Sequence, residues 1–378
     1  MQYLDLAIPN PTAASFDGPG EGRHPGRFVV VDRQRGQYLG HPTTVLLEDG
    51  RTMFAVYPIG HGAGAIVMKR SSDAGFTWGP RLDVPDSWET SREVPTIYRV
   101  VDRSGTRRLI MFSGLYPIRM AVSDDDGRTW SELEPIGNFG GVVAMADLVA
   151  TAPGSYLAVF HDDGRFLRGG EETVKGSSAG PRGDFIVYKT MSDDGGLTWS
   201  EPVAIVSRSD ADLCEPGIVV SPDGSTMAML LRENSRKHNS FVMLSYDRGQ
   251  SWSAPRELPA ALTGDRHQAC YTVDGRLVVS FRDMARGSAT YGDWVAWVGR
   301  WDDLVAGTDG EYRVRVMDNL PNANGSVSDC AYPALEVLPE GAVVATTYGH
   351  WIAGETPFIL SVRFTPWELD EIARGSAQ

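Results

Sequence analysis

The sequence predicts an all-β chain folded as a six-bladed β-propeller, because it combines a repeated motif, a repeated strand pattern and few helix signals. The motif reads Ser-x-Asp-x-Gly-x-Thr-Trp and occurs at residues 71–78, 123–130 and 192–199, with a fourth copy at 245–252 in which Ser251 replaces Thr. Asp accepts backbone N–H bonds and Gly adopts a positive φ, so the motif favours a tight turn. The Trp can then cover that turn. We interpret these four box motifs as structural turns.

The strands are expected in groups with one order: strand, Asp-Gly turn, strand, loop, strand, box motif, strand. Residues 1–26 are rich in Pro, Gly and Ala and are expected to form an irregular lead-in. A strand at 27–32 is expected to complete the last blade. Four strand groups carry a box motif and two later groups lack one, so the sequence predicts six blades. The tail 366–375 begins with Pro and ends with Gly, as a helix prefers. No composition break appears, so residues 1–378 are expected to form a single domain.

Composition excludes several classes of protein. The formal net charge is −14, which argues against a nucleic-acid partner because phosphate binding needs a basic face. No apolar stretch approaches the about 20 residues of a membrane span. Residues 1–5 lack a basic or apolar leader segment, so the expected location is the cytoplasm, or outside the cell if a leader was removed. Neither the three cysteines nor any Gly-rich loop has metal- or phosphate-binding spacing, so no cofactor is expected.

Polar residues concentrate just before the first strand and just after the second strand of the predicted blades. In a propeller both places lie at one end of the central channel, so these side chains are expected to converge on one mouth. Burying so many ionisable groups without a ligand is costly, which indicates a binding site. The residues before first strands are His41, Glu93, Glu215, Asp265, Arg266, His267, Asp329 and Tyr332; those after second strands are His61, His161, Asp162, Asp163, Arg165, Arg232, Glu233, Asn234, Arg282, Asp283, Tyr348 and His350.

The box motifs, the six repeated groups and these positions resemble the sialidase (neuraminidase) superfamily over most of the chain. That family places a Tyr nucleophile before a strand, an Asp-Gly turn and a strand ending in Tyr-Glu; Tyr332 and Tyr348 follow this layout. The resemblance implies Tyr332 as the nucleophile, Glu215 as the base toward it and Arg232 as a ligand of the sugar's carboxylate. A neutral phenol can approach a carbon that carries a carboxylate without charge repulsion.

The sequence departs from the family pattern at three places. Where the family has its first carboxylate-binding Arg in an Arg-Ile-Pro run, this chain reads Gly40-His41-Pro42. The loop that carries the family's acid/base Asp holds no carboxylate here, and His61 in that loop is the candidate acid. The third Arg has no clean counterpart. Rival acids and substitute arginines come from later blades: Asp162 and Asp163, and Arg282 or Arg286.

The favoured function is an exo-acting glycoside hydrolase of the sialidase type that cleaves a terminal sialic-acid-like or other acidic sugar. Two alternatives stay open: an enzyme that uses His/Tyr acid–base chemistry on uronic-acid or other glycosides, as a hydrolase or lyase, and a glycan-binding propeller without catalysis. Structural roles also stay open, with Tyr332 as a core tyrosine bonded to Asp329 and Glu215 with Arg232 as an ion pair. The oligomeric state is left open. The expected ligand is a glycan or a small acidic sugar, bound by Arg232, Arg282, His41, Arg165, His267, Arg266, Asp329 and Tyr348.

Overall fold

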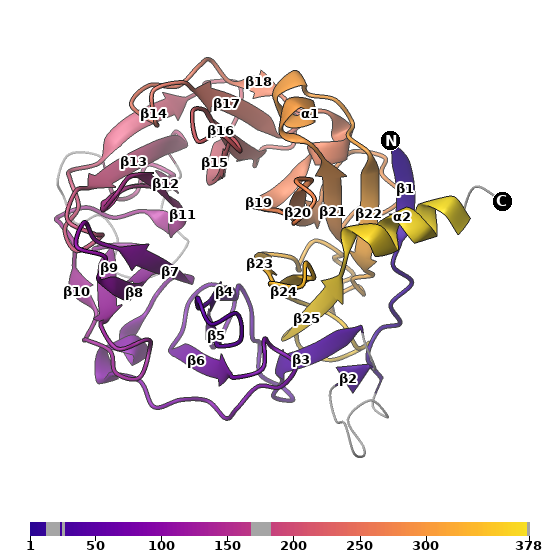
Figure 1. Cartoon of the computed structure of the whole chain (residues 1–378), viewed down its shortest axis with the longest axis horizontal. Coiled ribbons are helices and arrows are strands. Elements are labelled where there is room, and N and C mark those ends of the chain that lie inside the picture. Colours follow the sequence, from indigo (N-terminus) through magenta and orange to yellow (C-terminus); the bar gives the residue numbers. More distant parts are fainter. Residues whose placement is uncertain (13–22, 25–26, 168–182, 376–378) are drawn as a thin grey trace. The chain divides into compact units, whose positions relative to one another are not determined.

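The computed structural model of the chain describes residues 1–12, 23–24, 27–167 and 183–375. These residues form six sheets that follow one another along the sequence and are the blades of a β-propeller, which confirms the predicted fold class (Figure 1). They group into two compact units: Met1–His61 with Met68–Leu82 and Leu258–Gln378, and Gly62–Val67 with Asp83–Glu257. The expectation of a single domain over residues 1–378 stays a prediction.

The first unit contains three sheets, and the strands that follow one another along the chain pair antiparallel. The first sheet consists of β4 (Thr43–Leu46), β5 (Met53–Pro58) and β6 (Ile66–Ser71, whose first two residues group with the second unit). The second consists of β19 (Gly264–Tyr271), β20 (Leu277–Asp283), β21 (Trp294–Gly299), β22 (Tyr312–Met317) and β1 (Gln2–Asp5). The third consists of β23 (Ala334–Val337), β24 (Val343–Gly349), β25 (Phe358–Phe364), β3 (Phe28–Asp32) and β2 (Arg23–His24).

The second unit contains three four-stranded sheets, each ordered in space as it is in sequence. Their strands are β7 (Pro95–Val101), β8 (Arg107–Ser113), β9 (Arg119–Ser123) and β10 (Glu134–Pro135); β11 (Val142–Ala152), β12 (Ser155–Asp162), β13 (Ile186–Ser192) and β14 (Val203–Ser207); and β15 (Leu213–Val220), β16 (Met227–Glu233), β17 (Phe241–Ser245) and β18 (Arg256–Glu257). In all three sheets the box motif connects the third strand to the fourth, as the sequence predicts.

The beginning of the chain is more regular than expected. β3 pairs antiparallel with β25, so the predicted strand at 27–32 does complete the last blade. However, β1 pairs parallel with β22 and β2 pairs with β3, so the expectation of an irregular lead-in was wrong for these two strands. β1 covers the open edge of β22, and its Leu4, together with Leu6 just after the strand, belongs to the apolar core of the unit. Residues 13–22 and 25–26 of the expected lead-in lie outside the described residues.

Few segments are helical. The predicted helix at the C-terminal end is present as α2 (Pro366–Gly375), and it packs across β1 through its buried face, which includes Leu369 (Figure 1). The described residues also contain α1 (Trp301–Ala306) and the 3-10 turns η2 (Asp86–Thr90) and η3 (Ala260–Leu262), which the sequence did not predict. These additions are short and do not change the fold class.

The box motif is a hydrogen-bonded turn. In the third copy the Ser192 hydroxyl accepts the Gly196 N–H at 2.9 Å and donates to Asp194 at 2.8 Å. Asp194 also accepts the backbone N–H and the hydroxyl of Thr198, at 3.0 and 2.6 Å. The Trp199 indole donates to the Gly196 carbonyl at 3.1 Å. Because these Ser and Asp atoms bond within the turn, as they do in the other three copies, the interpretation as structural turns is confirmed.

A backbone feature that the sequence did not reveal marks the start of five blades. At or just before the first strand a non-glycine residue has a positive φ, namely His41 (50°), Val143 (50°), Glu215 (48°), Arg266 (57°) and Ala331 (55°). This conformation costs on the order of 1 kcal/mol or more and persists only where the surrounding structure enforces it. Shifts of strand register accompany it in β11, β15 and β19. Such irregularities re-aim side chains, and three of the five residues are candidate site residues.

Candidate functional site

Most of the candidate residues gather in two clusters, one within each unit. In both clusters, residues at the starts of first strands contact residues at the ends of second strands, which is the pairing of places that the sequence predicts. The tyrosine–histidine cluster of the first unit consists of Tyr38, His41, His61, Asp265, Arg266, His267, Arg282, Asp329, Tyr332, Tyr348 and His350; the carboxylate–arginine cluster of the second unit consists of Glu93, His161, Asp162, Asp163, Arg165, Glu215 and Arg232. That all these residues converge on one mouth of the central channel stays a prediction.

His41 is the centre of the aromatic contacts in the tyrosine–histidine cluster. Its ring lies 4.4 Å from that of Tyr332, 4.6 Å from that of Tyr348 and 4.7 Å from that of His61, between ring centroids. Burial, together with the neighbouring His61, lowers the pKa of His41 well below its ordinary value. Its Nδ1 is buried and has no hydrogen-bond partner among the described residues. The position where the resemblance expects an arginine therefore holds a neutral ring.

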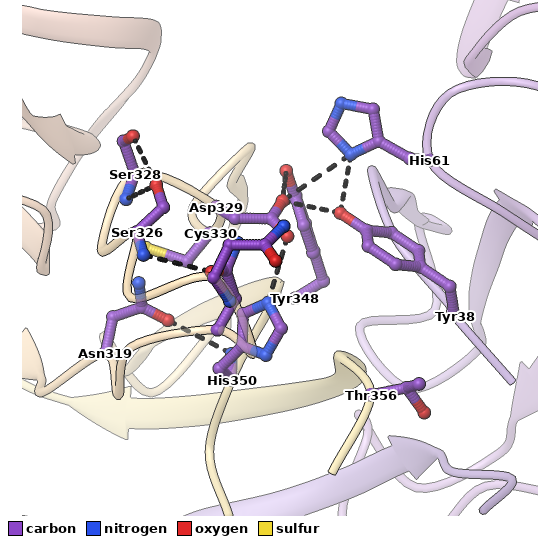
Figure 2. A network of polar contacts seen from close by, with 12 residues as sticks. Tyr38, His61, Asn319, Ser326, Ser328, Asp329, Cys330, Tyr348, His350 and Thr356 are labelled. Carbon is purple, nitrogen blue, oxygen red and sulfur yellow. Dashed lines mark hydrogen bonds and ion pairs between the residues drawn. The ribbon is translucent and has the colours of Figure 1, made fainter. Parts of the chain in front are cut away.

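Asp329 is the polar centre of the same cluster (Figure 2). Its Oδ1 accepts the Tyr38 hydroxyl at 2.6 Å and the Tyr348 hydroxyl at 3.4 Å, and its Oδ2 is 2.9 Å from His350 Nε2. Burial would raise the pKa of Asp329, but the hydrogen bonds from His350, His61 and Tyr38 hold it well below the ordinary value. Asp329 is therefore an ionised carboxylate that accepts hydrogen bonds from two tyrosine hydroxyls and faces the rings of His61 and His350.

Tyr38 connects this carboxylate to His61. The Tyr38 oxygen lies 2.6 Å from His61 Nδ1, while that nitrogen lies 3.5 Å from Asp329 Oδ1. Burial and the charge of Asp329 raise the pKa of the Tyr38 phenol, so it keeps its proton. The side chain of His61 is 64% exposed, whereas that of Asp329 is only 16% exposed. The sequence analysis did not single out Tyr38, although it lies three residues before His41, near the start of a first strand.

Tyr332, the candidate nucleophile, lies between His41 and a guanidinium group. The Arg282 guanidinium carbon is 5.6 Å from the centroid of the Tyr332 ring. Arg282 is fixed by an ion pair with Asp265 and by a hydrogen bond of 3.1 Å from Nη1 to the Cys330 carbonyl. A cationic group that the protein itself holds in place therefore lies beside the candidate nucleophile.

Arg266 and His267 are neighbours in sequence but differ in their surroundings. Arg266 is 3% exposed, and its Nη1 has no hydrogen-bond partner among the described residues. Burying a guanidinium is costly unless an anion meets it, so this side chain favours an anionic ligand. His267 is completely buried, with Nε2 2.9 Å from the Leu262 carbonyl and its ring 4.8 Å from that of Phe281. These contacts indicate a packing role for His267.

The carboxylate–arginine cluster is held by ion pairs. Arg232 donates from Nη1 to Glu215 at 2.7 Å and from Nη2 to Asn234 at 2.7 Å. The backbone N–H of Glu215 points at Nδ1 of His161, 3.4 Å away, and the His161 ring stacks on Phe185 at 5.9 Å. Glu215 and Arg232 are therefore paired with each other, as the structural alternative expects. Tyr332 lies in the first unit and Glu215 in the second, and their partnership stays a prediction.

Asp162 and Asp163, the alternative candidates for the general acid, bond to residues of the loop that follows them. Asp162 accepts the backbone N–H groups of Gly164 and Phe166 at 3.0 and 3.2 Å, and burial raises its pKa. Asp163 pairs with Arg165 Nε at 2.5 Å. These bonds fix the first residues of the connection that follows β12. Residues 168–182 of the predicted long loop lie outside the described residues.

Glu93 is a buried carboxyl group that belongs to the polar residues predicted to lie before first strands, but the sequence predicts no catalytic or binding role for it. Burial raises the pKa of Glu93 to about 7, although the backbone N–H of Val94 donates to it at 2.9 Å. The charge of Arg165 lowers this pKa and the charge of Glu215 raises it. Glu93 can therefore exchange a proton near neutral pH.

Among residues 1–12, 23–24, 27–167 and 183–375, no group of three His, Cys, Asp or Glu side chains is arranged to hold a metal ion. In the same part of the chain, no helix is long and apolar enough to span a bilayer.

Comparison with protein families and curated proteins gives partial matches. Residues 111–283 match the model of the BNR repeat-like domain. A sialidase of Paraclostridium sordellii is 27% identical over 187 residues, which covers 44% of this chain and 44% of that protein. A sialidase of Clostridium perfringens is also 27% identical over 187 residues, covering 44% of this chain and 47% of that protein. The matches thus cover less than half of the length of these curated relatives.

Solved structures with the same fold extend over most of the chain. A Dyadobacter fermentans protein of unknown function has a TM-score of 0.67 at 15% identity, covering 89% of this chain and 97% of that one. The NanB sialidase of Streptococcus pneumoniae has a TM-score of 0.59 at 12% identity, covering 90% and 71%. An intramolecular trans-sialidase of Ruminococcus gnavus has a TM-score of 0.55 at 16% identity, covering 88% and 95%. With the box motifs, these similarities confirm the predicted resemblance to the BNR-repeat propellers of the sialidase superfamily.

Proposed function

We propose that this sialidase-like propeller is an exo-acting glycoside hydrolase that removes a terminal acidic sugar, with Tyr332 as the nucleophile and Glu215 as the base toward it. The observation that carries the proposal is the environment of Tyr332, whose ring lies 5.6 Å from the Arg282 guanidinium and 4.4 Å from the ring of His41. The curated relatives named sialidases support the same reaction type. Because those relatives are 27% identical to this chain over the matched residues, the test below covers several classes of sugar.

In the proposed first step, the Tyr332 oxygen attacks the anomeric carbon while its proton passes to the Glu215 carboxylate. The bond from that carbon to the leaving oxygen breaks, and His61 in its imidazolium form gives a proton to the leaving oxygen. In the second step, water attacks the anomeric carbon and gives a proton to His61, and the bond from that carbon to the Tyr332 oxygen breaks. Glu215 then returns its proton to Tyr332, which restores the starting state of all three groups.

The acidic group of the sugar is assigned to Arg266. This guanidinium is buried and has a nitrogen without a hydrogen-bond partner among the described residues, so an oxyanion would satisfy it. Arg282 pairs with Asp265 and Arg232 pairs with Glu215, so each of these guanidinium groups already meets an opposite charge within the protein. A substrate carboxylate held at Arg266 explains why a cationic side chain is buried there.

A panel of aryl glycosides tests the proposal, covering sialic, other ulosonic, uronic and neutral sugars. We expect release from a sialic or ulosonic substrate by the wild type, and a loss of roughly 10³-fold or more in Tyr332→Phe. Tyr246→Phe is the matched control, because Tyr246 is largely exposed and lies in a box motif. Equal activity of Tyr332→Phe and the wild type would contradict the mechanism.

A second function has an observation of its own in its favour. The exposed His61 is bonded through Tyr38 to an ionised carboxylate, which is an arrangement for proton transfer by histidine. We propose as the alternative that this histidine acts on a uronic-acid glycoside as a hydrolase or lyase. In the same panel, activity confined to uronic substrates, lost in His61→Gln and retained in Tyr332→Phe, would favour the alternative. An unsaturated product would identify a lyase.

A further inference from the structure

We propose that Tyr38 and Asp329 are positioning residues that fix the ring of His61 with its proton on Nδ1 and leave Nε2 as the atom that exchanges a proton with the substrate. The exchange with a substrate rests on the proposed function. The fixed ring and its tautomer are properties of the described residues alone and can be tested separately.

The assignment of the proton follows from counting donors. Asp329 is an ionised carboxylate and has no proton to give. The Tyr38 hydroxyl has one proton, which it donates to Asp329 Oδ1 at 2.6 Å. The Tyr38 oxygen therefore has only lone pairs to offer His61 Nδ1, which lies 2.6 Å away. For that contact to be a hydrogen bond, Nδ1 must carry the proton.

A second contact supports the same tautomer. His61 Nδ1 also lies 3.5 Å from Asp329 Oδ1. Both oxygens near Nδ1 are thus acceptors, and a lone pair on Nδ1 would meet two electron-rich atoms. When the ring is neutral, Nε2 keeps its lone pair and can act as a base; when it is protonated, Nε2 can donate.

The position of Asp329 is fixed from the side opposite His61. His350 Nε2 lies 2.9 Å from Oδ2, and the backbone N–H of His350 donates to Asn319 at 3.0 Å. The Asn319 side chain in turn donates to the Val327 carbonyl at 2.8 Å. The connection between β22 and β23 is therefore bonded to the end of β24, and Asp329 is fixed as an acceptor for Tyr38. Figure 2 shows these residues together.

His61 needs such a partner because its own loop holds it weakly. Its side chain is 64% exposed, and the glycines on both sides, Gly60 and Gly62, have φ of 141° and 78°. A histidine in an exposed glycine-flanked loop would otherwise sample several ring orientations, and ordering it has an entropic cost. In Figure 2 the second ring nitrogen of His61 is turned away from Tyr38 and Asp329. The bond to Tyr38 thus selects one orientation and leaves the other nitrogen available.

The tautomer is tested by nitrogen NMR of imidazole-labelled protein at a pH where His61 is neutral. His61→Gln identifies the signals of His61 by their disappearance. We expect a protonated Nδ1 and an unprotonated Nε2 in the wild type, and a mixture of tautomers in Tyr38→Phe, which lacks only the hydroxyl. The Tyr246→Phe control should leave the signals unchanged. A protonated Nε2 in the neutral wild type, or identical signals in Tyr38→Phe, would overturn the proposal.

The kinetic test separates positioning from binding. Once a substrate is known, Tyr38→Phe should lower kcat by roughly 10-fold to 100-fold while KM stays within about twofold, because the lost bond orients a proton-transfer group. An unchanged kcat would contradict the positioning role. If the NMR result is as expected but the panel shows no hydrolysis, the positioning of His61 stands and the proposed function fails.

Discussion

Buried carboxylates in the two clusters are compensated in different ways: Asp265 in the first cluster pairs with Arg282, as Glu215 and Asp163 in the second cluster pair with arginines, but Asp329 does not. Glu215 and Asp163 in the second unit each meet a guanidinium, at 2.7 and 2.5 Å. Asp329 in the first unit instead accepts bonds from the hydroxyls of Tyr38 and Tyr348 and lies against the ring of His350. An arginine stays charged at any physiological pH, so its ion pairs are fixed. Hydroxyls and imidazoles can move protons, so the surroundings of Asp329 suit proton transfer, whereas the ion pairs fix the positions of the Glu215 and Asp163 carboxylates.

This difference predicts which substitutions change stability and which change activity. Removing one partner of a buried ion pair leaves an uncompensated charge and costs much of the stability of the protein. Removing an exposed histidine that is bonded to a hydroxyl should cost little stability but should remove its chemistry.

The largest effect is expected for Arg232→Met. This change leaves Glu215 buried without its guanidinium partner, and we expect a decrease of about 3–5 kcal/mol in the free energy of unfolding. Urea denaturation measures it. Arg128→Met, at an exposed site in the second box motif, is the matched control and should stay within about 0.5 kcal/mol of the wild type. Equal stability of the two variants would show that the pair does not hold the cluster.

A pH-dependent effect is expected for Glu93. Burial raises its pKa from the ordinary 4.5 to about 7, so the unfolded state releases the proton at lower pH than the folded state. The wild type should therefore lose stability as pH rises from about 4.5 through 7, by about 3 kcal/mol in total. Glu93→Gln should lack this loss. Unfolding free energies of both proteins from pH 4 to pH 8 measure the difference, and parallel curves would contradict the raised pKa.

Asp329 gives the opposite sign in the other cluster. Hydrogen bonds from His350, His61 and Tyr38 lower its pKa despite burial, so its contribution to stability is present above the ordinary pKa of 3.8. That contribution should disappear as pH falls through the lowered value. Asp329→Asn should therefore be less stable than the wild type at neutral pH and approach it in strong acid. A stability difference that does not depend on pH would contradict this interpretation.

A smaller effect is expected in the box motifs, which belong to the framework. Asp194 accepts bonds from Ser192, Leu197 and Thr198, and Asp194→Ala should cost about 1–2 kcal/mol. Asp193→Ala is the matched control, because that neighbouring side chain is exposed and should cost less than about 0.5 kcal/mol. Thermal unfolding distinguishes the two, and activity of the folded variants should be unchanged in both.

The smallest effect on stability is expected for His61→Gln, within about 0.5 kcal/mol, because the side chain is 64% exposed. Its activity should nevertheless fall by roughly 10²-fold, as expected for loss of a general acid. His238→Gln is the control, since His238 pairs with Glu257 in the second unit and is part of neither cluster. A variant of His61 that hydrolyses substrate at the wild-type rate would remove this residue from the mechanism.

Local patterns in the sequence are enough to predict the fold and the positions along the chain where candidate site residues stand. The box motifs and the strand, turn, strand order are local patterns, because Asp194 bonds only to residues within four positions of it. The same order predicted that residues before first strands meet residues after second strands. That prediction holds within each unit, for example where Arg282 contacts Asp265 and where Arg232 contacts Glu215.

The chemistry that each cluster can perform depends instead on contacts between residues that are distant in the sequence. The proposed role of Tyr38 depends on its hydrogen bond to Asp329, which is 291 residues away in sequence, and no local pattern connects the two residues. The positive φ of His41, Glu215 and Arg266 and the pairing of β1 with β22 are likewise enforced by long-range packing. Burial then sets the charge states, lowering the pKa of His41 and raising that of Glu93. A sequence specifies residue types along the chain, but desolvation and hydrogen bonding depend on neighbours that only the folded chain brings together.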